Sequence, residues 1–117
     1  MRHEESNLQI ACVRWFRLQY PSLAPLLFSV PNGGRRDRVT GAILKAEGAV
    51  AGVADLLLLV PNIHRHGLCI EMKTPKGRQS PEQKAWQKAV ESFGYKYAVV
   101  RYFEEFRDLI LDYFGAK

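Results

Sequence analysis

The sequence of 117 residues contains no long hydrophobic run. None of its apolar stretches approaches the roughly 20 consecutive residues that a membrane-spanning helix needs. The first seven residues also lack the apolar centre of a secretion signal. We therefore expect an intracellular protein, cytoplasmic or nucleoid-associated, without a membrane partner.

Cysteine is scarce, with only Cys12 and Cys69 present. Both lie in apolar contexts and far apart in sequence, which predicts two buried free thiols instead of a disulfide or a metal pair. Several classes of enzyme are excluded, because there is no P-loop, no dinucleotide fingerprint and no arrangement typical of a serine or cysteine nucleophile. Without internal repeats or low-complexity tracts, we expect one domain over residues 1–117.

The charge balance is basic. Seventeen Lys and Arg residues against twelve Asp and Glu residues give a formal net charge of +5, and 47% hydrophobic residues suffice for a globular core. An excess of positive charge favours a polyanionic partner such as nucleic acid. The cations predicted to contact phosphate lie just after a glycine pair at 33–34 or in the polar loop at 74–79. They are Arg35, Arg36, Arg38, Lys76 and Arg78. A solvated charge run is the alternative.

The segment from residue 52 to residue 73 carries the chemistry. It reads as two neighbouring strands, the first a nearly continuous apolar run and the second alternating. Side chains two residues apart in a strand point to the same face, so Glu71 and Lys73 lie on one face of the second strand. A hairpin can bring Asp55 close to them. Two carboxylates suit Mg²⁺ or Mn²⁺, and a lysine nearby can orient water or neutralise a phosphate. The alternative is an exposed Glu71–Lys73 pair beside a strand start.

The remaining sequence predicts alternating helices and strands. Glu5 and Gln9 lie four residues apart on the first helix, where Glu5 is either a first-turn acid or a third carboxylate of the site. Gln83 fits a capping box with Ser80, although it can also bind water or phosphate. The predicted helices span residues 4–20, 38–47, 81–93 and 103–114, and the predicted strands span 26–30, 55–60, 69–73 and 97–102.

Five motifs, in this order and at this spacing, resemble the VRR-NUC domain of the PD-(D/E)xK nuclease superfamily. They are Glu5-Ser6-x-x-Gln9 with Val13-Arg14-Trp15-Phe16, then Pro31-Asn32-Gly33, Gly52-Val53-Ala54-Asp55-Leu56, Glu71-Met72-Lys73, and Ser80-Pro81-Glu82-Gln83 with Trp86 and Gly94-Tyr95. The resemblance covers nearly the whole chain. It implies an α/β, restriction-endonuclease-like fold with a central mixed β-sheet flanked by helices.

The resemblance also implies a site. Asp55 and Glu71, with the Met72 carbonyl, would bind Mg²⁺ or Mn²⁺, Lys73 would activate or orient water, Glu5 would complete the acidic cluster and Gln83 would support it. The superfamily's proline before the aspartate is replaced here by Ala54, which leaves the ligand in place. Small free-standing members resemble Holliday-junction resolvases and act as homodimers.

The function implied is a structure-selective endonuclease of phage or bacterial type that acts on branched DNA such as four-way junctions. Two alternatives stay open. One is a flap nuclease, nickase or exonuclease of the same fold, and the other is a nuclease-like module that binds DNA without cutting it.

Overall fold

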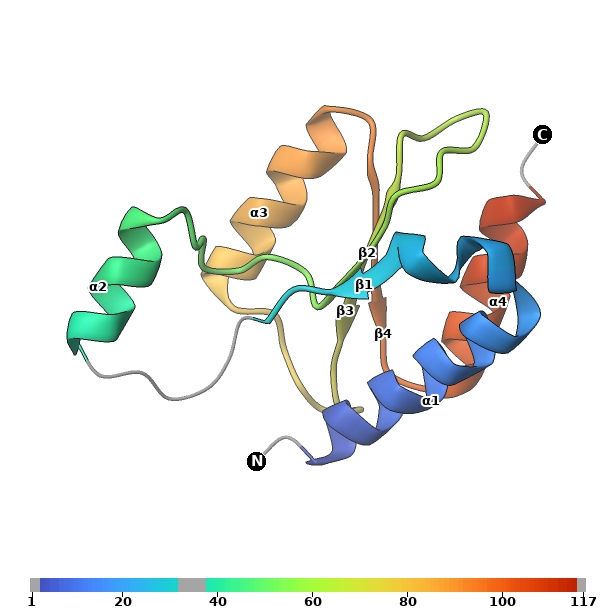
Figure 1. Ribbon diagram of the computed structural model, residues 1–117, viewed down its shortest axis with the longest axis horizontal. Helices are drawn as coiled ribbons and strands as arrows, with labels where there is room; N and C mark the ends of the chain where they lie inside the picture. Colours follow the sequence, from blue (N-terminus) through green and yellow to red (C-terminus); the bar gives the residue numbers. More distant parts are fainter. Residues whose placement is uncertain (1–2, 32–37, 116–117) are drawn as a thin grey trace.

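The computed structural model describes residues 3–31 and 38–115, and its centre is a mixed four-stranded sheet with helices on both faces (Figure 1). The strands lie in the order β1-β2-β3-β4; the first three are antiparallel neighbours, and β4 runs parallel to β3. The elements are α1 (His3–Gln19), η1 (Pro21–Leu26), β1 (Leu27–Ser29), α2 (Arg38–Ala46), β2 (Leu56–Leu58), β3 (Leu68–Met72), α3 (Pro81–Ser92), β4 (Lys96–Val100) and α4 (Phe103–Phe114). The predicted mixed sheet flanked by helices is confirmed.

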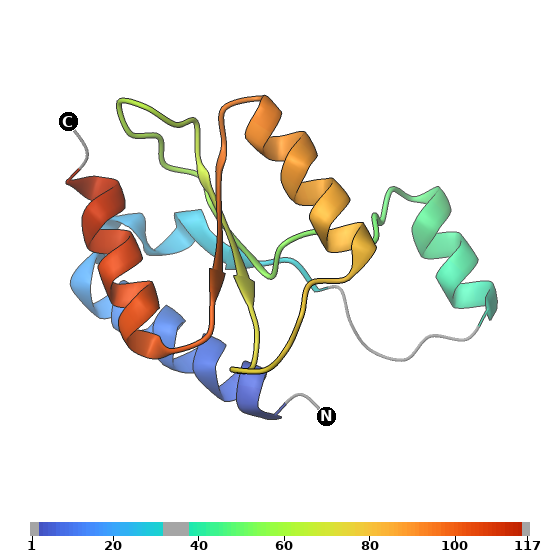
Figure 2. The ribbon, with the colours of Figure 1, turned by 180° about the vertical axis from the view of Figure 1, so that it is seen from behind.

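The two faces of β3 follow the predicted alternation. Leu68, Ile70 and Met72 join a buried cluster with side chains of α1 and α4, whereas Cys69 packs with Ala54 and Tyr97 on the other face, towards α3. Figures 1 and 2 show α1 and α4 on one side of the sheet and α3 on the other. Because successive strand residues point to opposite faces, Glu71 and Lys73 are directed away from the larger cluster.

The helix α4 covers the larger cluster with its apolar side. Phe106 and Ile110 are fully buried, and Phe106 meets Trp15 of α1 edge to face with ring centroids 6.1 Å apart. Two hydrogen bonds then tie α4 to the hairpin between β2 and β3. The Tyr113 hydroxyl donates to the Val60 carbonyl at 2.7 Å, and Asn62 Nδ2 donates to the Tyr113 carbonyl at 2.9 Å.

The start of α3 agrees with the predicted capping box. The Gln83 backbone N–H donates to Ser80 Oγ at 3.1 Å, and the Ser80 backbone N–H donates to Gln83 Oε1 at 2.8 Å. Pro81 occupies the first turn, where a missing N–H costs nothing. This cap fixes the direction in which α3 leaves the loop after β3.

Two elements differ from the sequence prediction. The 3₁₀ helix η1 was not predicted, because Pro21 read only as the end of the first helix, yet proline at the first position also suits a short helical turn. The strand β2 ends at Leu58 and not at residue 60, and Leu59 is 55% exposed. Its partner β1 is equally short, since η1 ends immediately before it and Pro31 follows closely.

The helix α2 stands apart from the sheet in both ribbon views (Figures 1 and 2). Its backbone spans Arg38–Ala46, close to the predicted helix over residues 38–47, and Gly48 follows its end. Arg35 and Arg36, two of the predicted phosphate-binding residues, lie outside the described residues, as does the side chain of Arg38. Within residues 3–31 and 38–115, no helix has the length and apolar character needed to cross a membrane.

Candidate active site

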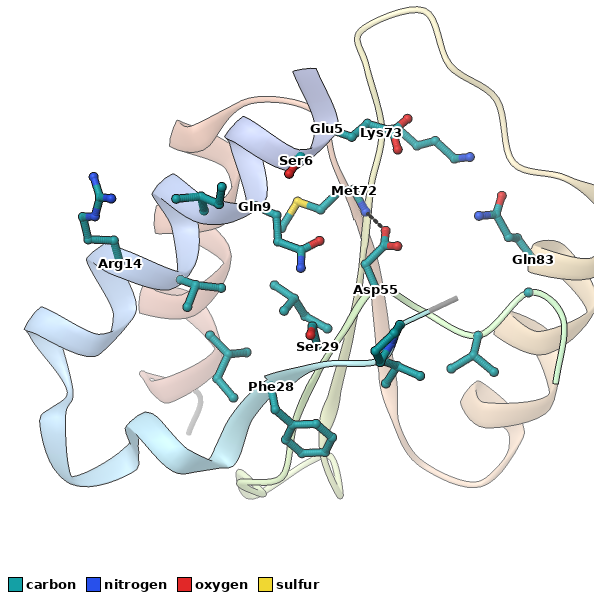
Figure 3. Close-up of a pocket in the computed structure, with 18 of the residues that line it drawn as sticks. Glu5, Ser6, Gln9, Arg14, Phe28, Ser29, Asp55, Met72, Lys73 and Gln83 are labelled. Atoms are coloured by element: carbon teal, nitrogen blue, oxygen red, sulfur yellow. Dashed lines mark hydrogen bonds between the residues drawn. The ribbon is translucent and has the colours of Figure 1, made fainter. Parts of the chain in front are cut away.

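The register of the hairpin brings Asp55 to the end of β3. Leu56 pairs with Ile70 in the antiparallel ladder, so Asp55 comes one step further along, opposite Glu71. The Met72 backbone N–H donates to Asp55 Oδ2 at 2.6 Å (Figure 3). The strand residues Asp55, Glu71 and Lys73 therefore meet at one place, as the hairpin predicted.

Glu71 is a buried carboxylate, with 1% of the residue exposed. Its Oε1 accepts hydrogen bonds from the Tyr97 hydroxyl and from Gln79 Nε2, the latter at 3.1 Å. Its Oε2 is also buried and accepts no hydrogen bond in the described part of the chain, but lies 3.4 Å from Lys73 Nζ. A buried charge is costly unless it is paired, so Oε2 is the oxygen that has capacity left for a cation.

The electrostatics of the site follow from this crowding. Burial raises the pKa of Asp55 above its ordinary value, the Met72 N–H opposes that change, and the negative charges of Glu5 and Glu71 add to it. Lys73 lowers the pKa of Asp55 in turn. Burial and the hydrogen bond to Glu71 raise the pKa of Tyr97, which keeps its hydroxyl a donor.

One cavity of about 1410 Å³ connects the strand residues to α1 and α3. Glu5 and Gln9 line it from α1, Asp55, Met72 and Lys73 from the strands, and Gln83 from α3 (Figure 3). Among the described residues, no three His, Cys, Asp or Glu side chains come close enough together to hold a metal ion by themselves. Glu5 shares the cavity with Asp55, and its direct ligation of an ion stays a prediction.

Gln83 serves the helix cap with one end of its amide. Its Oε1 accepts the hydrogen bond from the Ser80 N–H, while the residue also lines the cavity. The structural reading of Gln83 is therefore confirmed. The cap does not use the amide nitrogen, so it leaves a donor for water or phosphate at the same residue.

Gly52 holds the segment before Asp55 against α3. Its φ is +88°, and a Cβ built there would lie 2.4 Å from the Glu82 carbonyl oxygen. Glycine is required on both counts, because other residues rarely adopt this φ and none can approach the backbone so closely. This contact sets the spacing between the Asp55 strand and the start of α3, where Gln83 lies.

Sequence reasoning missed two partners of Glu71 and one residue that holds the loop after β3. Gln79 Nε2 donates to Gln87 Oε1 at 2.9 Å as well as to Glu71, and Tyr97 reaches Glu71 from β4. Arg101 Nη1 donates to the carbonyls of Thr74 and Gly77 at 2.8 and 2.6 Å, which fixes the loop between β3 and α3. These partners lie 8 to 27 positions apart in sequence, so no local pattern indicates them.

The predicted DNA-binding cations do not all come to the cavity. Lys76 and Arg78 are exposed on the loop after β3, outside the residues that line it. Two other arginines, Arg14 and Arg17 of α1, do line the cavity. Sequence reasoning treated that helix as a source of acids and overlooked them, although both lie three or four positions from cavity residues of the same helix.

Asp55 and Lys73 line the open cavity, and Glu71, which is not among its lining residues, forms an ion pair with Lys73. These two carboxylates and the ammonium form an arrangement suited to phosphodiester chemistry. Carboxylates bind a hard divalent cation, and an ammonium beside them can stabilise negative charge on a phosphate or hold a water molecule. Both roles need charged groups whose positions are fixed before the substrate arrives. The hydrogen bonds of Asp55 and Glu71 fix their carboxylates.

The chain is similar to known proteins in sequence profile and in fold. The profile of the VRR-NUC domain family matches residues 3–103. A solved structure described as a VRR-NUC domain protein superposes with a TM-score of 0.80 at 24% sequence identity, over 93% of this chain and 86% of that chain. At this identity the likeness shows a shared fold. A search of curated proteins found no match.

Proposed function

This chain belongs to the VRR-NUC domain family, a nuclease-type family, and from that premise we propose that it is a metal-dependent endonuclease acting on branched DNA. The observation that carries the proposal is the meeting of Asp55, Glu71 and Lys73 at one end of the sheet, beside an open cavity. An ordinary surface ion pair would not include a carboxylate as deeply buried as Glu71.

The donors fit a hard cation such as Mg²⁺ or Mn²⁺. Among the described residues Glu71 Oε2 is buried and accepts no hydrogen bond, and Asp55, which lines the cavity, uses Oδ2 for the Met72 N–H and so keeps Oδ1 for another partner. Mg²⁺ is commonly held by one or two carboxylates together with waters and substrate phosphates. We propose Asp55, Glu71 and the Met72 carbonyl as ligands, with Glu5 as a further acid nearby.

The bound cation would polarise the phosphate and lower the pKa of water beside it. The chain's own groups would do the rest. Lys73, held by its ion pair with Glu71, would orient the attacking water or neutralise charge that develops on the phosphate. Gln83, with its oxygen engaged in the helix cap, would donate its amide hydrogens to water or phosphate.

DNA affinity would come from cations outside this centre, including Arg35, Arg36, Arg38, Lys76 and Arg78. We further propose a homodimer, because one site per subunit would allow two strands of a junction to be cut symmetrically. The preference for a junction over a flap or a nick is part of this proposal. The family assignment does not specify it.

The test is cleavage of labelled four-way junction, flap, single-stranded and plain duplex DNA with Mg²⁺ or Mn²⁺. Wild type is compared with Lys73→Ala and Asp55→Ala, and with Lys88→Ala as a control on the exposed side of α3. We expect paired cuts in the junction, reduced at least about a hundredfold in both site variants and unchanged in the control.

Cutting of the flap alone would retain the site and replace junction resolution by flap cleavage. A circular substrate separates endonuclease from exonuclease, since only the former opens it. If wild type cuts nothing with either metal, the enzymatic proposal is wrong, and DNA binding without cutting becomes the function.

A further inference from the structure

We infer that the cavity continues beyond the catalytic residues as a track for an unpaired DNA strand, with Arg14 and Arg17 binding its phosphates and Phe28 stacking on a base. This inference rests on the proposed function and adds the form of DNA that reaches the site. The same cavity that holds Asp55 and Lys73 extends along α1 and the edge strand β1.

One wall of the track is a face of α1 that changes character along its length. Two rows of residues at four-residue spacing line the cavity, Glu5-Gln9-Val13-Arg17 and Ser6-Ile10-Arg14-Leu18. At about 1.5 Å per residue, Arg14 and Arg17 lie roughly 14 and 18 Å along the helix from Glu5. The acid therefore lies at the catalytic end of this wall and the two cations towards its far end. Figure 3 labels Glu5 and Arg14 at these two places.

The other wall includes the edge strand β1. Phe28 of β1 lines the cavity and is 39% exposed, and on the α1 wall Ile10 and Leu18 are 51% and 74% exposed. The strand β1 is the edge of the sheet, so no further strand covers this side in the described part of the chain. An exposed aromatic ring and two arginines that line the same cavity can offer one strand a base face and phosphate contacts.

This combination fits an unpaired strand better than a duplex. A duplex presents phosphates outward and keeps its base faces stacked inside, so it would use the arginines and gain nothing from Phe28. An unpaired strand offers both groups to the same cavity. A second copy of the chain is the other candidate occupant, but one that filled the whole cavity would cover Asp55 and Lys73, which line it, and close the catalytic end to substrate.

The arginines are tested by DNA binding in the presence of EDTA, which prevents metal-dependent cutting. Fluorescence anisotropy compares a fork with one unpaired arm, a single strand and a blunt duplex of equal length. The variant is Arg14→Ala/Arg17→Ala, and the control Lys88→Ala/Arg107→Ala removes the same charge outside the cavity. We expect at least about tenfold weaker binding of fork and single strand, with the salt slope reduced by about 1.4 because two contacts are lost.

Phe28 is tested with a matched pair of substitutions. Phe28→Leu keeps an apolar side chain but removes the ring, so affinity for the unpaired arm should fall about fivefold or more. Phe28→Trp keeps a stacking surface and should bind as wild type does. Neither change should alter binding of the blunt duplex, and circular dichroism confirms that both variants fold.

Three outcomes would overturn the inference. The first is equal binding by the arginine variant and its charge-matched control. The second is an equal loss on fork and blunt duplex, which would make the cavity a duplex site. The third is a change of mass in light scattering for the arginine or Phe28 variants, which would make it an interface between copies. Since binding is measured without metal, failure of cleavage would leave these results intact and count only against the proposed function.

Discussion

Among single residues, Glu71 shows most clearly how the fold prepares a reactive group. Its Oε1 accepts hydrogen bonds from β4 and from the loop before α3, while its Oε2 pairs with the ammonium of Lys73 and accepts no hydrogen bond from any described residue. The carboxylate therefore has one oriented oxygen and one available oxygen. In a surface carboxylate that rotates freely, the two oxygens would be equivalent.

Removing the Tyr97 hydroxyl should destabilise the protein. Tyr97→Phe takes one donor from a buried carboxylate, and a hydrogen bond to a charged group is worth about 2 kcal/mol. Denaturant unfolding should give a lower midpoint with an unchanged slope. Tyr95→Phe is the control, because the Tyr95 hydroxyl makes no hydrogen bond within the described ranges. Equal loss in both variants would show that the hydroxyl adds nothing specific.

Much of the arrangement of the candidate site could be predicted from residues. Period two alone places Glu71 and Lys73 on one face, and a tight hairpin register brings Asp55 opposite. Tyr97 and Gln79 could not be predicted, since nothing near them in sequence resembles a site. Their contacts with Glu71 form only when β4 and the loop after β3 pack around it.

At the scale of elements, the close contact between Gly52 and α3 should contribute to the stability of the fold around the site. Gly52→Ala forces a strained φ and a clash with the Glu82 carbonyl oxygen, so we expect a loss of about 2 kcal/mol or more. Gly48→Ala is a matched control, because Gly48 has a φ of +112° but nothing within 4 Å of an added Cβ. It should lose only about 1 kcal/mol.

Thermal and denaturant unfolding of the two variants provide the measurement. The difference between them isolates the contact with α3 from backbone strain. If Gly48→Ala costs as much as Gly52→Ala, the close approach to Glu82 contributes nothing and the segment has room to move.

The helices and strands were predictable in kind and order because their signals are local. Ser80 and Pro81 mark the start of α3, and the apolar periodicity of residues 103–114 marks α4. The lengths of β1 and β2 were not predictable, since a strand continues only as far as a partner strand pairs with it. The helix η1 was missed for a different reason: a proline can end one helix and also begin the next helical turn.

For the whole molecule, the two thiols predict a loss of stability in alkali. Burial raises the pKa of Cys12 from 9.0 to about 12 and that of Cys69 from 9.0 to about 11. The folded state then keeps protons that the unfolded state releases. Their contribution is complete below about pH 9 and falls above it by about 1.4 kcal/mol per thiol per pH unit, until the folded pKa is reached.

Urea unfolding between pH 8 and pH 10.5 measures this loss, and Cys12→Ala/Cys69→Ala should show a smaller decline over the same range. A thiol reagent gives an independent check at pH 8. Both cysteines should react quickly in guanidinium and slowly in the native protein. Fast reaction of the native protein would contradict the burial of these side chains.

The link between Tyr113 and the hairpin has a consequence for how the chain acquires its shape during synthesis. The hydrogen bond to Val60 spans 53 positions, and α4 leaves the ribosome after all four strands. Until then the sheet face bearing Leu56 and Ile70 lacks its last cover. A nascent chain halted before residue 103 should thus remain a client of chaperones, and release of the final helix should end that dependence.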